Sequence, residues 1–228
     1  MTKKQYWLLP GTFYVLATIL DLLGRLWFPP VHDLVKPALL PLLAATTIAA
    51  AGGLDSRLVR LLLFAQVFGC AGDIMLLYPG NFWFIVGIGS FFIGHIFYLI
   101  IFGEKAWKGM SVWTWLISAV VILSMLLVLS VAIGIKGVML VPMCTYGIML
   151  LLLIFCGVAG IFRLGGTTWW IMLSGAVLFT FSDSMIAVKE FAPDLNTPFM
   201  GFVIMLTYLS AQALLAWAAL RLAKKEMK

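Results

Sequence analysis

The sequence is poor in charged residues, histidine and cysteine, and each shortage excludes a class of protein. Only 11% of its 228 residues are charged, against about 25% in an average soluble domain. Two histidines are too few for a catalytic zinc ion held by three His ligands. Cys70, Cys144 and Cys156 lie in apolar runs without a CxxC pair, so we expect small buried thiols rather than disulfides or a zinc knuckle.

Hydrophobic residues, in contrast, make up 64% of the chain, and the mean hydropathy is +1.12. These values are typical of a polytopic membrane protein. The net charge of +6 is explained by an excess of Lys and Arg in cytoplasmic loops, so we expect no nucleic-acid partner. The first apolar run, Tyr6 to Phe28, is too long for a cleaved signal peptide and is predicted to be the first span.

Eight apolar stretches approach the roughly 20 residues that a bilayer-spanning helix needs. They cover residues 6–28, 36–53, 58–78, 82–102, 112–134, 137–161, 168–188 and 198–221. Turn-prone segments such as FPPVHD and YPGN separate them, and no loop is long enough for another domain. The sequence therefore predicts an all-α integral membrane protein, with residues 1–228 forming a single bundle of eight transmembrane helices.

The distribution of basic residues predicts the orientation of this bundle. With a cytoplasmic N-terminus, eleven Lys and Arg residues face the cytoplasm: Lys3, Lys4, Arg57, Arg60, Lys105, Lys108, Arg163, Arg221, Lys224, Lys225 and Lys228. Only four face outward: Arg25, Lys36, Lys136 and Lys189. This bias predicts that both termini are cytoplasmic. We expect a multi-pass protein of a bacterial inner membrane.

Several polar residues interrupt the apolar stretches, and such residues are expensive in a bilayer and commonly functional. The charged ones are Asp21, Lys36, Asp73 and Asp183, joined by His95. Each has a structural alternative: an ion pair between Asp21 and Arg25, a Lys36 side chain that snorkels to the surface, and a hydrogen bond from His95 to a neighbouring helix. The two remaining acids have no basic residue within one turn, and Lys36 is their simplest partner.

Helical spacing groups these residues into polar stripes on four of the predicted helices. The stripes are Tyr14, Thr18, Asp21 and Arg25; Gln66, Cys70 and Asp73; Phe91, His95 and Tyr98; and Tyr208 with Gln212. Asp73 and Asp183 each lie five residues before the end of a span, at similar predicted depth. Together the stripes predict a shared polar cavity, although Tyr146 and the Tyr208–Gln212 pair also suit interhelical hydrogen bonds.

A weak internal repeat with an offset of 110 residues relates Asp73 to Asp183 and Tyr98-Leu99 to Tyr208-Leu209. It pairs the third span with the seventh and the fourth with the eighth. We therefore expect a parallel four-plus-four repeat around an axis along the membrane normal.

Two carboxyl groups in one cavity suit general acid–base catalysis, with one group protonated and the other ionised. A metal site of His95, Asp73 and Asp183 is an alternative, whereas Ser182 and Ser184 lack a His partner for nucleophilic catalysis. Another alternative is a proton-coupled transporter of small molecules or lipids that uses the intramembrane Asp residues. A transporter is disfavoured because the predicted spans lack the paired Gly/Pro breaks that create carrier sites; Pro142 is the only strong interruption of a long span.

The polar motifs resemble those of the YhhN family of membrane lysoplasmalogenases over essentially the whole chain. The matching positions are Lys36-Pro37; Gly72-Asp73; Phe91, His95 and Tyr98; Gly175-Ala176, Phe179, Ser182-Asp183, Ala187 and Phe191; and Tyr208 with Gln212. Each motif alone is weak, but their occurrence together and in order is specific.

The resemblance implies a hydrolase for the vinyl ether bond of lysoplasmalogens, releasing a fatty aldehyde and a glycerophospho-base without a metal or organic cofactor. Bacterial-type members could act on another ether lipid. We expect Asp73 and Asp183 to be the catalytic acid and base, with His95 orienting a carboxyl group or the water. The expected substrate-binding residues are Arg25, Lys36, Tyr98, Tyr146, Tyr208 and Gln212. The partners implied are a lysophospholipid, water and membrane lipid.

Overall fold

The computed structural model describes residues 6–134, 137–191 and 197–226, and these ranges form eight α-helices. The helices are α1 (Leu8–Trp27), α2 (Pro29–Ala51), α3 (Arg57–Met75), α4 (Asn81–Ala106), α5 (Val112–Ile133), α6 (Leu140–Leu164), α7 (Thr167–Phe191) and α8 (Pro198–Glu226). The all-α prediction is confirmed. Seven of these helices are long and apolar enough to span a membrane, while the qualifying apolar part of α5, Val112–Val128, is shorter.

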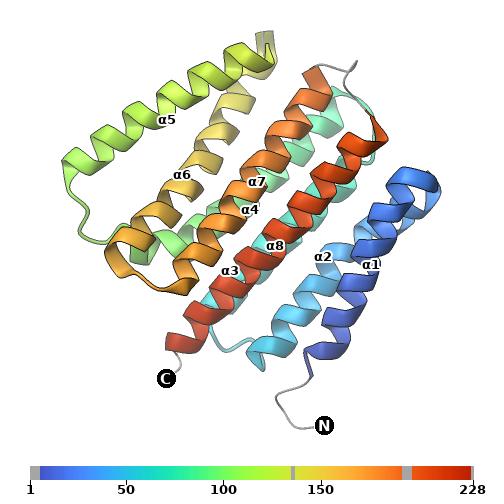
Figure 1. Ribbon diagram of the computed structural model, residues 1–228, viewed down its shortest axis with the longest axis horizontal. Coiled ribbons are helices and arrows are strands. Elements are labelled where there is room, and N and C mark those ends of the chain that lie inside the picture. Colours follow the sequence, from blue (N-terminus) through green and yellow to red (C-terminus); the bar gives the residue numbers. More distant parts are fainter. Residues whose placement is uncertain (1–5, 135–136, 192–196, 227–228) are drawn as a thin grey trace.

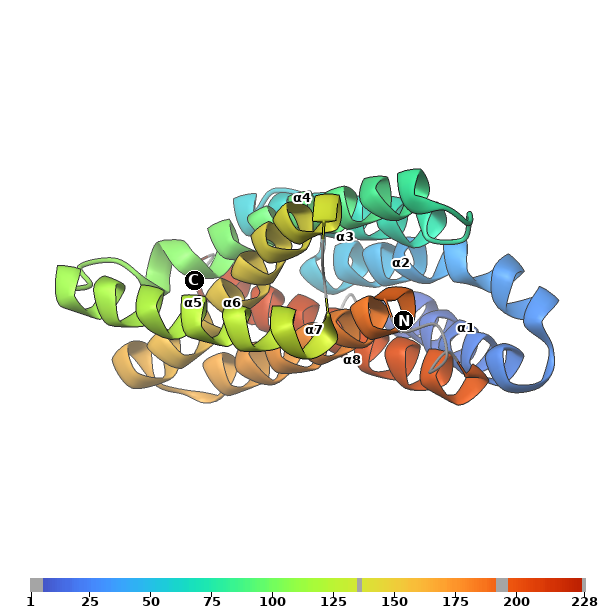
Figure 2. The ribbon, with the colours of Figure 1, turned by 90° about the horizontal axis from the view of Figure 1, so that it is seen from above.

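Six helices form the centre of the bundle, and two lie at its edges. In the centre, α3 packs between α2 and α4, and α7 packs between α6 and α8. The two triplets meet where α4 packs on α6 and where α8 packs on α2 and α3. Helix α1 lies against α2 and α8, and α5 lies against α6, which places these two helices at opposite sides of Figure 1. Figure 2 shows the same bundle from above.

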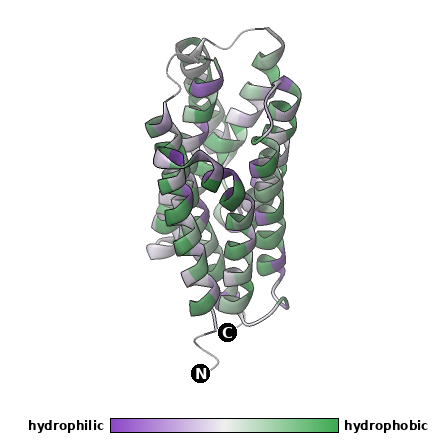
Figure 3. Cartoon of the chain, turned by 90° about the vertical axis from the view of Figure 1, so that its right-hand side faces the viewer, coloured by the Kyte–Doolittle hydropathy of each residue, from purple (hydrophilic) through white to green (hydrophobic). Residues whose placement is uncertain are grey.

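The outer surface of the bundle is apolar along its length. Large hydrophobic side chains on it include Leu34 and Phe162, which are 80% and 84% exposed. Figure 3 shows hydrophobic residues from one end of the helices to the other. Such an extensive exposed apolar surface is expected where lipid, rather than water, surrounds the protein. The chain is a multi-pass membrane protein.

The start of α2 corrects the sequence prediction of a loop at FPPVHD. Helix α1 ends at Trp27, and α2 begins at Pro29, so Phe28 alone links the two helices. Proline suits the first positions of a helix because no hydrogen-bonded N–H is needed there. His32 therefore lies in α2, one turn before Lys36, and not in a loop away from the site. Pro142 likewise lies in the first turn of α6 and does not interrupt a span.

The burial pattern supports the predicted internal repeat. Helices α3 and α7 begin 110 residues apart, at Arg57 and Thr167. Every buried residue of α3 has a buried counterpart 110 residues later in α7. The residues of α3 concerned are Leu58, Val59, Leu62, Ala65, Gln66, Gly69, Gly72 and Asp73. Because the two helices also occupy the middle of their triplets, the halves α2–α4 and α6–α8 are related in both sequence and packing.

Candidate active site

Asp73 lies near the C-terminal end of α3, where three helices meet around its carboxyl group. The end of α3 at Met75 places Asp73 two residues from the helix end, not five as predicted. Its Oδ1 lies 3.6 Å from Nζ of Lys36 on α2. The hydroxyl of Tyr208 on α8 donates a hydrogen bond of 2.8 Å to Oδ2. Lys36 is only 6% exposed, so the snorkelling alternative is wrong and the partnership with Asp73 is confirmed.

A buried hydrogen-bond chain extends from Asp73 into the bundle. The Tyr208 hydroxyl accepts a hydrogen bond of 3.3 Å from Nε2 of Gln212, whose Oε1 accepts one of 2.6 Å from Tyr98. Gly69 leaves room for this chain, because a Cβ there would lie 3.2 Å from Nε2 of Gln212. The chain fixes one orientation of the Tyr208 hydroxyl, which therefore points its proton at Asp73.

Asp183 lies on α7 with a different partner. Its Oδ2 accepts a hydrogen bond from the hydroxyl of Tyr146 on α6. The preceding Ser182 donates a hydrogen bond of 3.0 Å to the carbonyl of Ile204, which ties α7 to α8. Asp183 is 5% exposed. The chain thus holds two buried carboxyl groups, one in each triplet of helices.

His95 connects the surroundings of the two aspartates. Its Nδ1 lies 2.8 Å from the carbonyl of Phe91 and must carry a proton, because a carbonyl only accepts. Its ring contacts Tyr146 and Phe179 at centroid distances of 5.5 and 4.4 Å. Phe179 in turn contacts the ring of Tyr208 at 5.4 Å. The predicted bond from His95 to a neighbouring helix is wrong, since the Phe91 carbonyl belongs to its own helix.

Nε2 of His95 is buried and has no hydrogen-bond partner among the described residues. With Nδ1 protonated by its bond to Phe91, the neutral ring leaves Nε2 as an acceptor. A buried polar atom without a partner is rare in native proteins and calls for an explanation. This nitrogen can accept a hydrogen bond from a substrate hydroxyl or from a water molecule.

A cavity of about 430 Å³ opens beside Asp73. Its polar lining consists of Arg25, His32, Lys36, Asp73, Tyr78, Lys189, Glu190 and Tyr208. Its apolar lining includes Phe84, Phe91, Ile186, Ile204 and Met205. Cationic side chains outnumber acidic ones on these walls, and apolar side chains reach the same space. The cavity therefore suits a ligand with an anionic part and an apolar part.

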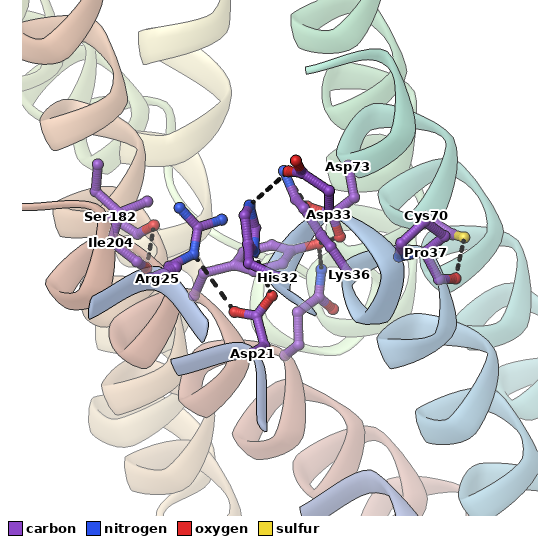
Figure 4. Close-up of polar contacts among 12 residues, drawn as sticks. Asp21, Arg25, His32, Asp33, Lys36, Pro37, Cys70, Asp73, Ser182 and Ile204 are labelled. Carbon is purple, nitrogen blue, oxygen red and sulfur yellow. Dashed lines mark hydrogen bonds and ion pairs between the residues drawn. The ribbon is translucent and has the colours of Figure 1, made fainter. Parts of the chain in front are cut away.

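An ion-pair cluster organises the basic side of this cavity. Asp21 is fully buried, and its carboxylate lies 3.4 Å from Nε of Arg25 and 2.6 Å from Nδ1 of His32. Figure 4 shows Arg25 and His32 converging on Asp21, with Lys36 beside them. The predicted pair of Asp21 with Arg25 is confirmed, and His32 joins it. One buried acid thus holds two cavity-lining side chains in place.

The structure divides the predicted site residues into three groups. Lys36, Asp73, Tyr98, Tyr208 and Gln212 form the continuous network described above. Arg25 lines the cavity next to it. Asp183, Tyr146 and His95 are not among the residues that line this cavity. Of the two aspartates, Asp73 alone lines it, so this cavity differs from the predicted one, which both carboxyl groups would face.

The metal alternative also fails on geometry. Among the described residues, no three His, Cys, Asp or Glu side chains are grouped so that they could hold a metal ion. His95, Asp73 and Asp183 therefore do not form a metal site here. The three cysteines are free thiols, but only Cys156 is buried, whereas the sequence predicted burial of all three.

His32, Lys189 and Glu190 are cavity residues that sequence reasoning missed. A signal for His32 existed, because its four-residue spacing from Lys36 places both on one helix face. The misassigned loop at Pro29 hid that spacing. Lys189 and Glu190 lie on the last turns of α7, beyond the predicted span end at residue 188. These two residues can line the cavity because α7 continues to Phe191.

Sequence comparisons relate the chain to a known family of proteins. The sequence model of the YhhN family matches residues 31–219. The chain is 33% identical to lysoplasmalogenase TMEM86B of Mus musculus, over 96% of this chain and 88% of the mouse protein. It is 32% identical to lysoplasmalogenase TMEM86B of Homo sapiens, over 71% of this chain and 64% of the human protein. No solved structure matches the chain significantly. The extent of these matches shows that the chain belongs to the YhhN family.

Proposed function

We propose that this chain is a lysoplasmalogenase-like hydrolase, which cleaves the vinyl ether bond of a lysophospholipid to a fatty aldehyde and a glycerophospho-base. The observation that carries the proposal is Asp73, a buried carboxyl group on the wall of a cavity that is both basic and apolar. The named activity of the TMEM86B relatives supports the choice of reaction. No metal or organic cofactor enters the proposed mechanism.

The basic wall of the cavity suits the phosphate of such a substrate. Arg25, His32, Lys36 and Lys189 all contribute to it. Arginine offers a planar set of donors that matches phosphate oxygens, and lysine adds a point charge. We assign phosphate binding to Arg25 and Lys36, with His32 and Lys189 as additional contacts. The alkenyl chain would then extend along Phe84, Phe91, Ile186, Ile204 and Met205.

The proposed reaction begins with proton transfer to the vinyl carbon that is not bonded to oxygen. The double-bond electrons form the new C–H bond, and the ether oxygen stabilises the resulting oxocarbenium ion. Water then adds to the carbon next to oxygen and loses a proton. The hemiacetal finally collapses to the aldehyde and the glycerol hydroxyl. A carboxylic acid and a carboxylate can catalyse these steps, as they do in glycosidases.

The structure favours unequal roles for the two aspartates. Asp73 lines the cavity and is the group placed to contact the reacting atoms. Asp183 is buried, does not line this cavity and is bonded to Tyr146. We assign proton exchange with the substrate to Asp73, which is an ion-paired carboxylate in the free protein. The substrate phosphate then binds the ammonium group of Lys36, and Asp73 takes up from water the proton that it transfers to the vinyl carbon. We assign to Asp183, the second buried acid, control of the charge in the site. His95, through its Nε2, would hold the water or a substrate hydroxyl.

A labelling experiment tests the reaction directly. Purified protein is incubated in D₂O with a 1-alkenyl lysophospholipid, and the aldehyde is analysed by mass spectrometry. We expect one deuterium on the carbon next to the aldehyde group, which reports proton delivery to the vinyl carbon. The matched 1-alkyl lysophospholipid, which lacks the double bond, should not react. Equal cleavage of both lipids, or no aldehyde at all, would contradict the proposal.

The transporter alternative predicts uptake driven by an ion gradient, without a lipid product. Carrier sites are typically created by paired interruptions of the helices. Among the described helices only α2 has prolines in its interior, Pro37 and Pro41, and it continues without a break to Ala51, which disfavours a transporter. Reconstituted liposomes with an imposed proton gradient distinguish the two functions. Gradient-dependent uptake without aldehyde release would favour the transporter.

We further propose that all eight helices cross the membrane and that both termini are cytoplasmic. Successive helices join at alternate ends, and both termini lie at the same end in Figure 1. That end carries Arg57, Arg60, Lys105, Lys108, Arg163, Arg221, Lys224 and Lys225. Four of the basic residues counted in the sequence lie outside the described residues: Lys3, Lys4, Lys136 and Lys228. In a bacterial inner membrane this orientation opens the cavity towards the periplasm.

Reporter fusions test the orientation. Fluorescent protein folds only on the cytoplasmic side, whereas alkaline phosphatase is active only after export. We expect fluorescence from fusions after Lys108 and Lys228 and phosphatase activity from a fusion at Gly80. The reverse pattern, or termini on opposite sides of the membrane, would overturn the proposed orientation.

A further inference from the structure

A second hollow lies at the other end of the bundle, the end that carries both termini. It is a groove of about 680 Å³ between α1, α2 and α8, a volume typical of sites for small molecules. Its walls are largely apolar and include Val15, Leu43, Ala50, Ala213 and Leu220. A groove of this composition on a membrane protein is suited to an acyl chain.

Basic and aromatic side chains border the groove. Arg221 and Lys224 line it, one turn apart on α8, and no acidic residue lines it. Neither of the two has an acidic partner within the described ranges, whereas nearby Lys105 is paired with Glu226 at 2.8 Å. Trp7 and Trp217 also line the groove and are 43% and 53% exposed. Half-exposed tryptophans are typical of the membrane interface.

The groove is distinct from the candidate active site, although both are built on α1, α2 and α8. On α8, Met205 and Tyr208 line the cavity, and Ala213 to Lys224 line the groove. The buried Gln212 lies between these two sets. Tyr14, on the groove wall, donates a hydrogen bond of 3.0 Å to the carbonyl of Leu209. Gln212 and Tyr14 thus form a polar layer between the groove and the candidate active site.

We propose that this groove binds an anionic phospholipid, with an acyl chain along its apolar wall and the phosphate on Arg221 and Lys224. Basic pockets between helices at a cytoplasmic membrane surface bind anionic lipid headgroups. The charge of the border disfavours the main alternative, a second copy of this chain. A two-fold dimer through this face would bring two basic borders together. The lipid site does not depend on the proposed catalytic activity.

Lipid titration of the purified protein in detergent tests the proposal. Phosphatidylglycerol and phosphatidylcholine with the same acyl chains are added separately, and binding is measured by native mass spectrometry and by thermal unfolding. We expect wild type to bind phosphatidylglycerol more tightly and to unfold at a higher temperature with it. The variant Arg221→Gln/Lys224→Gln should bind it about thirtyfold more weakly, since each cation near the surface contributes about fivefold.

Two further variants make the result specific. Lys225→Gln removes an exposed neighbouring charge that does not line the groove, and it should leave binding unchanged. Ala50→Phe narrows the groove and should weaken binding of both lipids. All four proteins should elute at the same volume in size-exclusion chromatography and unfold at similar temperatures in detergent without added lipid, which shows that each variant is folded. Equal binding of both lipids by wild type, unchanged binding by the double variant, or dimer formation that excludes lipid would overturn the proposal.

Discussion

The two triplets of the bundle place an aspartate at the same position but give it different partners. Asp73 on α3 is paired with Lys36 on α2, and Asp183 on α7 is bonded to Tyr146 on α6. Each residue of the second pair follows its counterpart by 110 positions. One carboxyl group faces an ammonium group and an open cavity; the other faces a phenol hydroxyl and lies apart from that cavity. A repeated scaffold thus supplies two acids in two electrostatic settings.

This difference explains how nearly equivalent positions can serve unequal roles. A buried ammonium group stabilises a neighbouring carboxylate by charge, whereas a neutral hydroxyl can also bond a protonated acid. Both acids accept a hydrogen bond from a tyrosine hydroxyl, but only Asp73 has an ammonium group beside it. The exchange of Lys for Tyr at one repeat position therefore contributes to the difference between the two acids. The comparison predicts that substitutions in the first half will have larger effects than the matching substitutions in the second.

The largest effect is expected for Asp73→Asn. It removes the only one of the two carboxyl groups that lines the cavity, and general acid–base catalysis contributes about 10²–10⁴-fold. We expect aldehyde release to fall by about 10³-fold, measured as kcat/KM with a 1-alkenyl lysophospholipid. Asp33→Asn, at an exposed aspartate next to His32, is the matched control and should retain activity. Normal turnover by Asp73→Asn would remove this residue from the mechanism.

The next effect is on stability, and it compares Lys36→Met with Tyr146→Phe. Loss of Lys36 leaves the Asp73 carboxylate without its cation, and breaking a buried pair costs about 3–5 kcal/mol. Loss of the Tyr146 hydroxyl removes one hydrogen bond, which costs about 1 kcal/mol in a membrane protein. Reversible unfolding in mixed micelles measures both. Adding Asp73→Asn to Lys36→Met should recover part of the loss, and equal losses in the two single variants would contradict the comparison.

Asp183→Asn should have an intermediate effect on activity. In the proposed mechanism Asp183 acts through its charge and does not line the cavity, so kcat should fall by about 10–100-fold, less than for direct proton transfer. KM should change little, and the pH dependence of kcat should move. A loss as large as that of Asp73→Asn, with an unchanged pH profile, would instead favour equal catalytic roles for the two acids.

The sequence was sufficient for the helices and for much of the site. Apolar length predicted the helices, and the high cost of buried charge singled out Asp73, Asp183 and Lys36. Helical spacing then placed Tyr208 and Gln212 on one face, as the hydrogen-bond network confirms. These features are local, because they depend on one helix and on the cost of burying polar groups in lipid.

Other features could not be derived from single helices. The separation of Asp183 from the cavity depends on how α6, α7 and α8 are rotated against each other. Ring contacts of Phe179 with Tyr208 and with His95 accompany this packing, and periodicity does not reveal such pairings. His32 was missed for a local reason, because Pro29 was interpreted as part of a turn when it begins a helix.

The smallest effects are expected at the residues that precede the two aspartates. Ser182 donates one hydrogen bond to the Ile204 carbonyl, so Ser182→Ala should cost about 0.6 kcal/mol and leave hydrolysis unchanged. At the corresponding position Gly72, a Cβ would lie 2.9 Å from the ring of Phe91, which lines the cavity. Gly72→Ala must move this ring and should raise KM, although it adds only one methyl group. If both variants hydrolyse substrate like wild type, the close packing of α3 against α4 does not shape the substrate site, and the functional contrast between the halves depends on Lys36 and Tyr146 alone.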